Sequence, residues 1–240
     1  MKQNVLKASV FGVAAMFTLT AAQATPVTVN NFSFEAQSIS PGGTIGEAAP
    51  TSWTGFNVGG GGVLGNGFDY GISYANAEFT EPLAAPADGN NYLWVNRWTG
   101  NGTQVAGVYQ DVGALSANTT YTLTVAIGLR GDGGPNGGWS PGIISLLNGT
   151  DNTGAILATG GGLPATPNSW QNYTASFTTG ATVSGDLIVD LSVLDGSHIQ
   201  ADFDNVRLDA SPVPEPGTCA LLGGGLFSLL ALRRNKASAN

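Results

Sequence analysis

Apolar and polar residues alternate with a period of two along much of this chain. Segment 120–129 has its large apolar residues on one face and small or hydroxyl residues on the other. The apolar face consists of Tyr121, Leu123, Val125, Ile127 and Leu129. Segment 172–178 repeats the pattern with Tyr173, Ala175 and Phe177. A period of two predicts β-strands with one buried face.

Further short segments of strand character are separated by clusters of Gly, Pro, Asn and Asp, and residues 25–211 contain no long segment with the helical period of 3.6. The predicted strands are Val27 to Glu35, Trp53 to Asn57, Tyr70 to Phe79, Tyr92 to Trp98, Ala106 to Val112, Gly142 to Leu147, Ala155 to Thr159, Leu187 to Leu194 and His198 to Leu208. About ten short strands between turn signals predict an all-β, two-sheet jelly-roll sandwich.

The last of these segments changes phase within itself. Ile199, Ala201 and Phe203 alternate inward, but from Val206 the apolar residues occupy the other parity. One extra residue in a strand produces such a change, so the sequence predicts a β-bulge beside Asp204.

Residues 90–98 read NNYLWVNRW and combine aromatic rings with amides. Tyr92, Trp94 and Trp98 share one face of this predicted strand, which is either core or ligand-binding. Sugar rings stack on Trp and Tyr while neighbouring amides bind their hydroxyls. We expect Trp139, which is flanked by turn-forming residues, to be an exposed aromatic of the same kind.

The N-terminal 24 residues have the pattern of a secretory signal peptide. Lys2 and Lys7 precede an apolar stretch, which ends in the cleavage pattern Ala22-Gln23-Ala24. Cleavage after Ala24 by the general secretion machinery would leave Thr25 as the first residue of the mature protein.

The C-terminal segment 212–240 has three parts: Pro214, Glu215 and Pro216, an apolar stretch over 219–232, and a basic cluster with Arg233 and Arg234. Proline on both sides of a glutamate gives an extended hinge. The apolar stretch is short for a transmembrane helix, which needs about 20 residues. In this order the three parts resemble the PEP-CTERM sorting signal. The resemblance implies transient anchoring in the inner membrane, cleavage by an exosortase, and a place on the cell surface or in an extracellular polysaccharide or biofilm matrix.

We expect residues 25–211, the body of the protein, to form one domain. The composition of this body limits the ligands that it can bind. It holds three arginines against fifteen carboxylates, a formal charge of −12. Such a charge repels phosphate backbones, so nucleic-acid binding is excluded. The only cysteine, Cys219, lies in the apolar tail, so the body has no disulfide.

The body also resembles galactose-binding-like jelly rolls, which include carbohydrate-binding modules. The similar motifs are NNFSFE at 30–35, LSANTTYTLTVAIG from Leu115, SWQNYTASFTT from Ser169 and FDNVRLDA from Phe203. The resemblance implies that the first and last strands lie side by side and that a structural calcium ion is held there by Glu35 and Asp204. Calcium takes six to eight oxygen ligands, so carbonyls and water would complete the shell. The alternative is that Glu35 and Asp204 are exposed strand-end carboxylates, or that they hydrogen-bond to neighbouring loop amides.

No catalytic arrangement stands out in the body. His198 has no cysteine or nucleophile elbow to serve, and Asp202 with Asp204 is the nearest approach to the paired acids of a glycoside hydrolase. We therefore expect a non-enzymatic, PEP-CTERM-sorted surface or matrix protein with a carbohydrate-binding-like domain. Two alternatives remain open: a structural or adhesive matrix protein without a specific sugar ligand, and a weak glycoside hydrolase.

Overall fold

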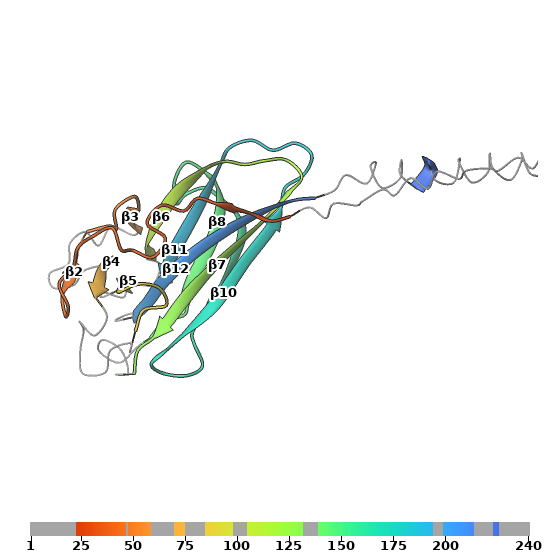
Figure 1. Cartoon of the computed structure of the whole chain (residues 1–240). Coiled ribbons are helices and arrows are strands. Elements are labelled where there is room, and N and C mark those ends of the chain that lie inside the picture. The colour runs from red at the N-terminus through yellow and green to blue at the C-terminus, as the bar shows by residue number, and fades with distance from the viewer. Residues whose placement is uncertain are drawn as a thin grey trace, which may run out of the picture.

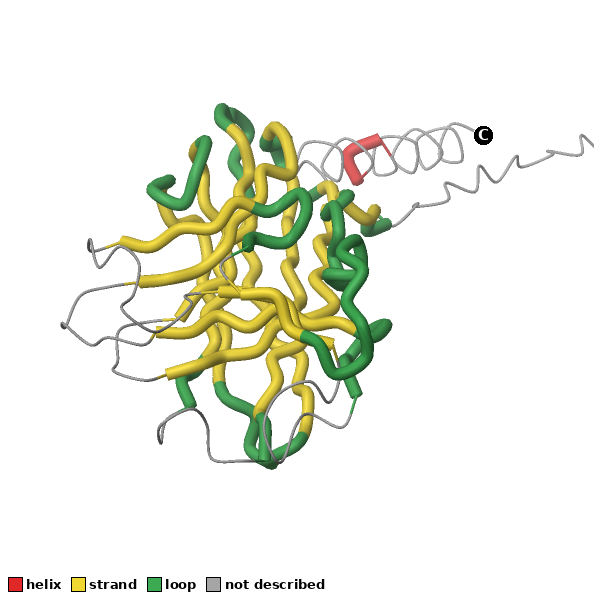
Figure 2. The backbone as a smooth tube through the Cα atoms, turned by 90° about the vertical axis from the view of Figure 1, so that its left-hand side faces the viewer, coloured by secondary structure: helices red, strands yellow, loops and turns green. Residues whose placement is uncertain are grey.

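The computed structural model describes residues 23–46, 48–58, 70–74, 85–97, 105–131, 139–193, 199–213 and 223–225. The described part of the body is almost entirely β-structure, arranged as two face-to-face sheets (Figures 1 and 2). Residues 223–225 form a short helical turn. Among the described residues, no helix has the length and apolarity required to cross a membrane.

The strands are β1 (Thr25–Val27), β2 (Thr44–Gly46), β3 (Thr54–Val58), β4 (Tyr70–Tyr74), β5 (Asn91–Arg97), β6 (Val105–Ala114), β7 (Thr119–Leu129), β8 (Gly142–Gly149), β9 (Ala155–Gly162), β10 (Ser169–Thr178), β11 (Asp186–Val193) and β12 (Ile199–Pro212). A seven-stranded sheet has the order β10-β7-β12-β5-β4-β2, with β1 paired to β12. A five-stranded sheet has the order β3-β6-β11-β8-β9. All of these pairs are antiparallel, which confirms the predicted two-sheet all-β sandwich.

The core lies between the two sheets and follows the predicted alternation. From β7 it contains Tyr121, Leu123, Val125 and Ile127, which are at most 4% exposed. The five-stranded sheet contributes Ala106, Val108, Ile144, Leu146, Val189, Leu191 and Val193. Burying large apolar side chains of this kind stabilises a fold by about 1.5–3 kcal/mol each. The period of two thus fixes which face of each strand points inward.

The bulge in the last strand is confirmed. The pairing of β12 with β7 shifts between Asp204 and Arg207, and Asn205 has a φ of 51°. As a result Phe203 and Val206 are both buried in the core, although an odd number of positions separates them. The bulge also leaves Asp204 fully buried at the point where the strand changes direction.

The predicted strand over Val27 to Glu35 is wrong beyond Val27. Residues 30–37 form turns, because Asn31 and Phe34 have φ values of 52° and 60°, in the left-handed region that strands do not use. The backbone amide of Val206 donates to the Phe32 carbonyl at 2.8 Å, so this turn segment is tied to the bulge. The first strand does lie beside the last one, with Thr25 paired to Ala210.

Candidate functional site

A single row of residues crosses the outer face of the seven-stranded sheet. Cross-strand pairs align Trp170 with Gly128, Gly128 with Asp202, Asp202 with Trp94, and Trp94 with Gly71. Directly paired residues of antiparallel strands share a face. The neighbouring residues Leu93 and Phe203 point into the core, so the row points away from it. Asp202 is therefore the middle residue of the row, with Gly128 and Trp170 on one side and Trp94 and Gly71 on the other.

Around Asp202 this outer face is buried, unlike the solvated outer face usual in antiparallel sheets. Asp202 is 0% exposed, and the side-chain amide of Gln200 donates to its Oδ1 at 2.7 Å. Gln200 pairs with Asn96 of β5, which is also buried. Arg130, just beyond β7, is 1% exposed. A carboxyl, a guanidinium and two amides thus gather outside the hydrophobic core, where they contribute nothing to apolar packing.

Aromatic rings frame this polar group. Tyr92 and Trp170 meet edge to face with their centroids 5.9 Å apart. The indole N–H of Trp94 donates to Thr44 Oγ1 at 3.3 Å, and that of Trp170 donates to the Ala85 carbonyl at 2.7 Å. A Cβ on Gly71 would clash with the Trp94 ring, so the ring lies directly over this glycine. These contacts fix the orientations of Tyr92, Trp94 and Trp170 on the outer face that carries Asp202.

The segment at Trp139 forms one edge of the same region. The Arg130 guanidinium lies 5.2 Å from the centre of the Trp139 ring, and the Ser140 amide donates to the Gln200 carbonyl at 3.1 Å. Asn96 Oδ1 and Trp139 Nε1 are buried and form no hydrogen bond to any residue that the structure describes. Buried polar atoms are nearly always hydrogen-bonded in native proteins, so these two atoms favour a polar ligand here.

The predictions for the aromatic residues agree with the structure only in part. Tyr92 and Trp94 do share a face away from the core, but they are 0% and 5% exposed rather than open to solvent. The exposure expected for Trp139 is also wrong, because it is half-buried against Arg130. Trp98 lies outside the described residues.

Glu35 and Asp204 converge on one segment, residues 87–91. Glu35 Oε1 accepts hydrogen bonds from the amides of Asn90 (2.7 Å) and Asn91 (2.6 Å). Asp204 Oδ2 accepts one from the amide of Asp88 at 2.8 Å, and its Oδ1 accepts one from Asn205 at 2.6 Å. The fold thus brings together two carboxylates that are 169 positions apart in the sequence.

Asp204 is an uncompensated buried acid. Burial, aided by the negative charge of Asp88, raises its pKa to about 8, and hydrogen bonds from backbone amides limit this shift. A bound cation would compensate this charge.

The residues around Glu35 and Asp204 suit calcium in their chemistry, because carboxylate, amide and carbonyl oxygens are its preferred ligands. Asn91 Oδ1 is buried without a hydrogen-bond partner among the described residues, and it is a further oxygen of the required type. No group of three or more His, Cys, Asp or Glu in metal-binding arrangement occurs in the described part of the chain. Main-chain carbonyls and water would therefore have to complete the shell.

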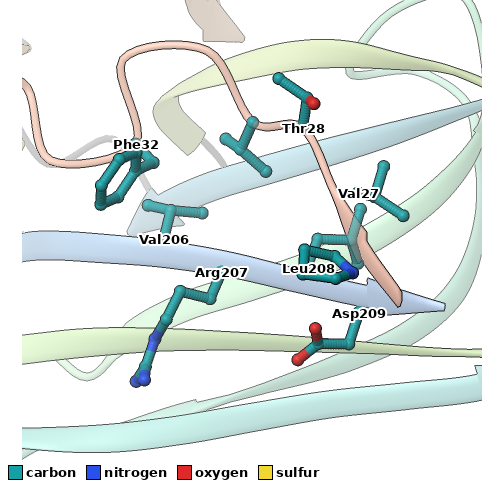
Figure 3. A pocket seen from close by; sticks show the side chains of 9 residues that line it. Val27, Thr28, Phe32, Val206, Arg207, Leu208 and Asp209 are labelled. Atoms are coloured by element: carbon teal, nitrogen blue, oxygen red, sulfur yellow. The ribbon is translucent and has the colours of Figure 1, made fainter. Parts of the chain in front are cut away.

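A hollow of about 400 Å³ lies between the N-terminal segment and β12. Figure 3 shows Val27 and Phe32 on one side of it, with Val206 and Leu208 of β12 on the other. Arg207 and Asp209 are the charged residues of its lining. Its walls are mostly apolar, and its carboxylate, Asp209, is only half-buried, so we place the candidate site at the fully buried Asp202 instead.

The processing residues are described only in part. Ala24 is exposed and lies directly before β1. Pro214, Glu215, Pro216, Arg233 and Arg234 lie outside the described residues.

Solved structures resemble most of this chain. A Stig cyclase, FisC, from Fischerella sp. TAU in complex with (3Z)-3-(1-methyl-2-pyrrolidinylidene)-3H-indole is 26% identical, with a TM-score of 0.67. The match covers 80% of this chain and 100% of that one. A cyclase from Fischerella sp. TAU in complex with 4-(1H-indol-3-yl)butan-2-one is 25% identical, with a TM-score of 0.65 and coverage of 80% and 100%. A search of curated proteins returns no match.

A structure described as "CBM4 structure and function" is also similar, at 18% identity and a TM-score of 0.47, covering 76% of this chain and 99% of that one. The jelly-roll arrangement itself follows from the strand order of the two sheets.

Two sequence-family models match the chain. The PEP-CTERM protein-sorting motif matches residues 212–235, which confirms the resemblance of the tail and makes the chain a PEP-CTERM-sorted extracellular protein. The HpiC1-like family, described as HpiC1 cyclase, matches residues 25–209. A cyclase family is in tension with the expectation of a non-enzymatic body. Since this match spans most of the chain, the chain belongs to the HpiC1-like cyclase family.

Proposed function

We propose that this protein is a ring-forming enzyme of the cell exterior whose substrate binds on the outer face of the seven-stranded sheet. The observation that carries the proposal is the buried Asp202 carboxyl, set in one row with Trp94, Gly128 and Trp170. Gly128 has no side chain of its own beside the carboxyl, and Trp94 and Trp170 of the same row contribute indole rings. Two similar structures contain indole compounds, so we propose an indole-sized aromatic substrate.

Ring closure without an oxidant requires only that a proton be added and removed. Asp202 would donate a proton to the unsaturated part of the substrate, which leaves a cationic carbon. A π bond of the same molecule then attacks that carbon and closes the ring, and the carboxylate takes a proton back. The product is an isomer of the substrate.

The surrounding residues suit this sequence of steps. The Gln200 amide holds Asp202 Oδ1 and so fixes the orientation of the carboxyl. The faces of Tyr92, Trp94 and Trp170 would stabilise a cationic intermediate, an interaction that contributes about 2 kcal/mol when desolvated. Burial excludes water, which would otherwise capture the cation.

The test is to incubate the mature protein with indoles that carry an unsaturated side chain. We expect a product of unchanged mass with one carbon–carbon double bond fewer and one ring more, detected by mass spectrometry and NMR. Unchanged substrate, under conditions where the same compounds bind, would contradict the proposal.

A sugar ligand for the same face is the second candidate. It is supported by the aromatic and amide side chains that Tyr92, Trp94 and Asn96 place on one face, although their burial disfavours a long glycan chain. If sugar binds here, Trp94→Ala should weaken glycan retention on an array by about 1–3 kcal/mol. If the wild-type protein binds no glycan, the sugar-ligand function is contradicted, and ring formation or a structural matrix role remains as the function of the protein.

We propose calcium as a structural ion held by Glu35 and Asp204. A ligand that binds only the folded state at a hundredfold excess over its Kd adds about 2.7 kcal/mol of stability. Removing calcium with a chelator should therefore lower the Tm of the wild type by several degrees and leave Asp204→Ala unchanged. Superimposable melting curves with and without chelator would contradict this.

The sorting motif gives a prediction that does not depend on the site. Glu215→Ala should leave the uncleaved precursor in the inner membrane, because the hinge is the segment that the exosortase recognises. In the wild type, by contrast, mass spectrometry of the surface protein should show that the chain ends near residues 212–218. Recovery of a surface form that still contains Arg233 would contradict removal of the tail.

A further inference from the structure

A separate pocket lies on the outer face of the other sheet, on the opposite side of the sandwich from Asp202. Its volume is about 340 Å³, within the usual range for small-molecule sites. The strand pairing sets Asp190 beside Ser145, and Ser145 beside Thr159. Ser192 lies in the next row, so four polar side chains form the floor. The walls are Phe56, Val105, Ile143, Leu147, Asn152 and Ile156.

The shape of this pocket depends on a glycine. Gly107 pairs with both Phe56 and Ser192, and a Cβ at this position would lie 2.8 Å from the Phe56 ring. The ring of Phe56 therefore leans over Gly107 and forms one wall. Ile156, in contrast, is 70% exposed at the rim. A large apolar side chain that is open to solvent beside a hollow favours an apolar ligand.

Asp190 is the distinctive group in this pocket. It is 6% exposed, and its Oδ1 accepts a hydrogen bond from Ser192 Oγ at 2.9 Å. Burial raises its pKa to about 7. Among the residues that the structure describes, no Lys, Arg or His lines the pocket, so none of them places a cation beside the carboxylate there. A buried charge without an opposite charge is costly.

In the described part of the chain, the elements packed around Asp190 bring no positive charge. The neighbouring strand β6 places Tyr109 directly beside it and Asp111 further along. Strands β8 and β9 contribute the hydroxyls of Ser145 and Thr159, and β3 contributes Phe56. Asp186 begins the same strand, and Asp151 lies in the turn before β9. The electrostatic surroundings are therefore neutral or negative, which disfavours anions and favours a cation.

We infer that this pocket is a second ligand site and that it binds a small organic cation, an amine attached to one apolar or aromatic group, with the amine against the Asp190 carboxylate. The amine would supply the missing opposite charge, and its apolar group would contact Phe56, Leu147 and Ile156. The inference is independent of the proposed ring-forming activity, which uses the other sheet.

The test compares 2-phenylethylamine with its neutral analogue 2-phenylethanol by calorimetric titration of the mature protein at pH 8. We expect saturable binding of the amine at one site, at least tenfold tighter than that of the alcohol. Asp190→Asn, which keeps the size of the side chain, should weaken amine binding at least tenfold and leave alcohol binding unchanged. Amine binding to the wild type should also weaken below pH 6, because a protonated carboxyl no longer pairs with the ammonium group.

Asp202→Asn is the matched control, since it neutralises a buried aspartate on the opposite sheet. We expect it to leave amine binding unchanged. Equal affinity for the amine and the alcohol, no binding of the amine at millimolar concentration, or loss of amine binding in Asp202→Asn but not in Asp190→Asn would each overturn the inference.

Discussion

Asp202→Asn should lower the rate of ring closure by at least about a hundredfold, because a positioned acid–base group typically contributes 10²- to 10⁴-fold to a reaction rate. Asparagine has nearly the same size as aspartate, and Gln200 can still donate to its side-chain oxygen, so the fold should persist. Substrate binding should change little. The measurement is the initial rate of isomer formation at saturating substrate, together with the far-ultraviolet circular dichroism of both proteins.

Asp190→Asn provides the control for this experiment. It also replaces a buried aspartate by asparagine, but on the outer face of the five-stranded sheet, away from the proposed substrate site. Its rate should equal that of the wild type. A variant Asp202→Asn with full activity would exclude Asp202 as the proton donor.

Asp190 should also make the protein less stable as the pH rises from about 4 to about 7. Burial raises the pKa of this carboxyl from its ordinary value of 3.8 to about 7. Between these values the folded state holds a proton that the unfolded state has released, so unfolding becomes easier with each increase in pH. The full effect corresponds to roughly 4 kcal/mol, since one pKa unit is worth about 1.4 kcal/mol.

The free energy of unfolding of wild type and Asp190→Asn should be measured by denaturant titration at several pH values without added amines. We expect equal stability near pH 4 and a variant that is more stable than the wild type by up to roughly 4 kcal/mol at pH 8. Asp204 contributes its own pH dependence to both proteins, so it cancels in the difference. Parallel curves would mean that Asp190 ionises as an ordinary carboxyl.

The sheets were largely predictable from the sequence because alternation reports burial directly. The apolar faces of segments 120–129 and 172–178 do point toward the core. The change of phase in the last strand correctly located the bulge at Asp204 and Asn205. Local residue order contains this information, since a strand with one buried face must place apolar residues at every second position.

The turn over residues 30–37 and the candidate site were not predictable in the same way. Phe34 sits in a left-handed conformation that a bulky residue adopts only when tertiary contacts hold it, and local pattern gives no sign of that. The site requires knowing that Asp202 pairs with both Trp94 and Gly128, which depends on strand order and register. One signal was available: Gln200, Asp202 and Asp204 place three polar side chains on one face of the last strand.

The most direct test of the proposed site is a crystal structure of the mature protein with 4-(1H-indol-3-yl)butan-2-one, a compound present in a similar cyclase structure. We predict that its indole ring lies between Trp94 and Trp170 on the outer face of the seven-stranded sheet, with its ketone oxygen within hydrogen-bond distance of Asp202. Density for the compound at the Asp190 pocket or in the hollow beside Phe32, with none over the Asp202 row, would contradict this assignment of the site.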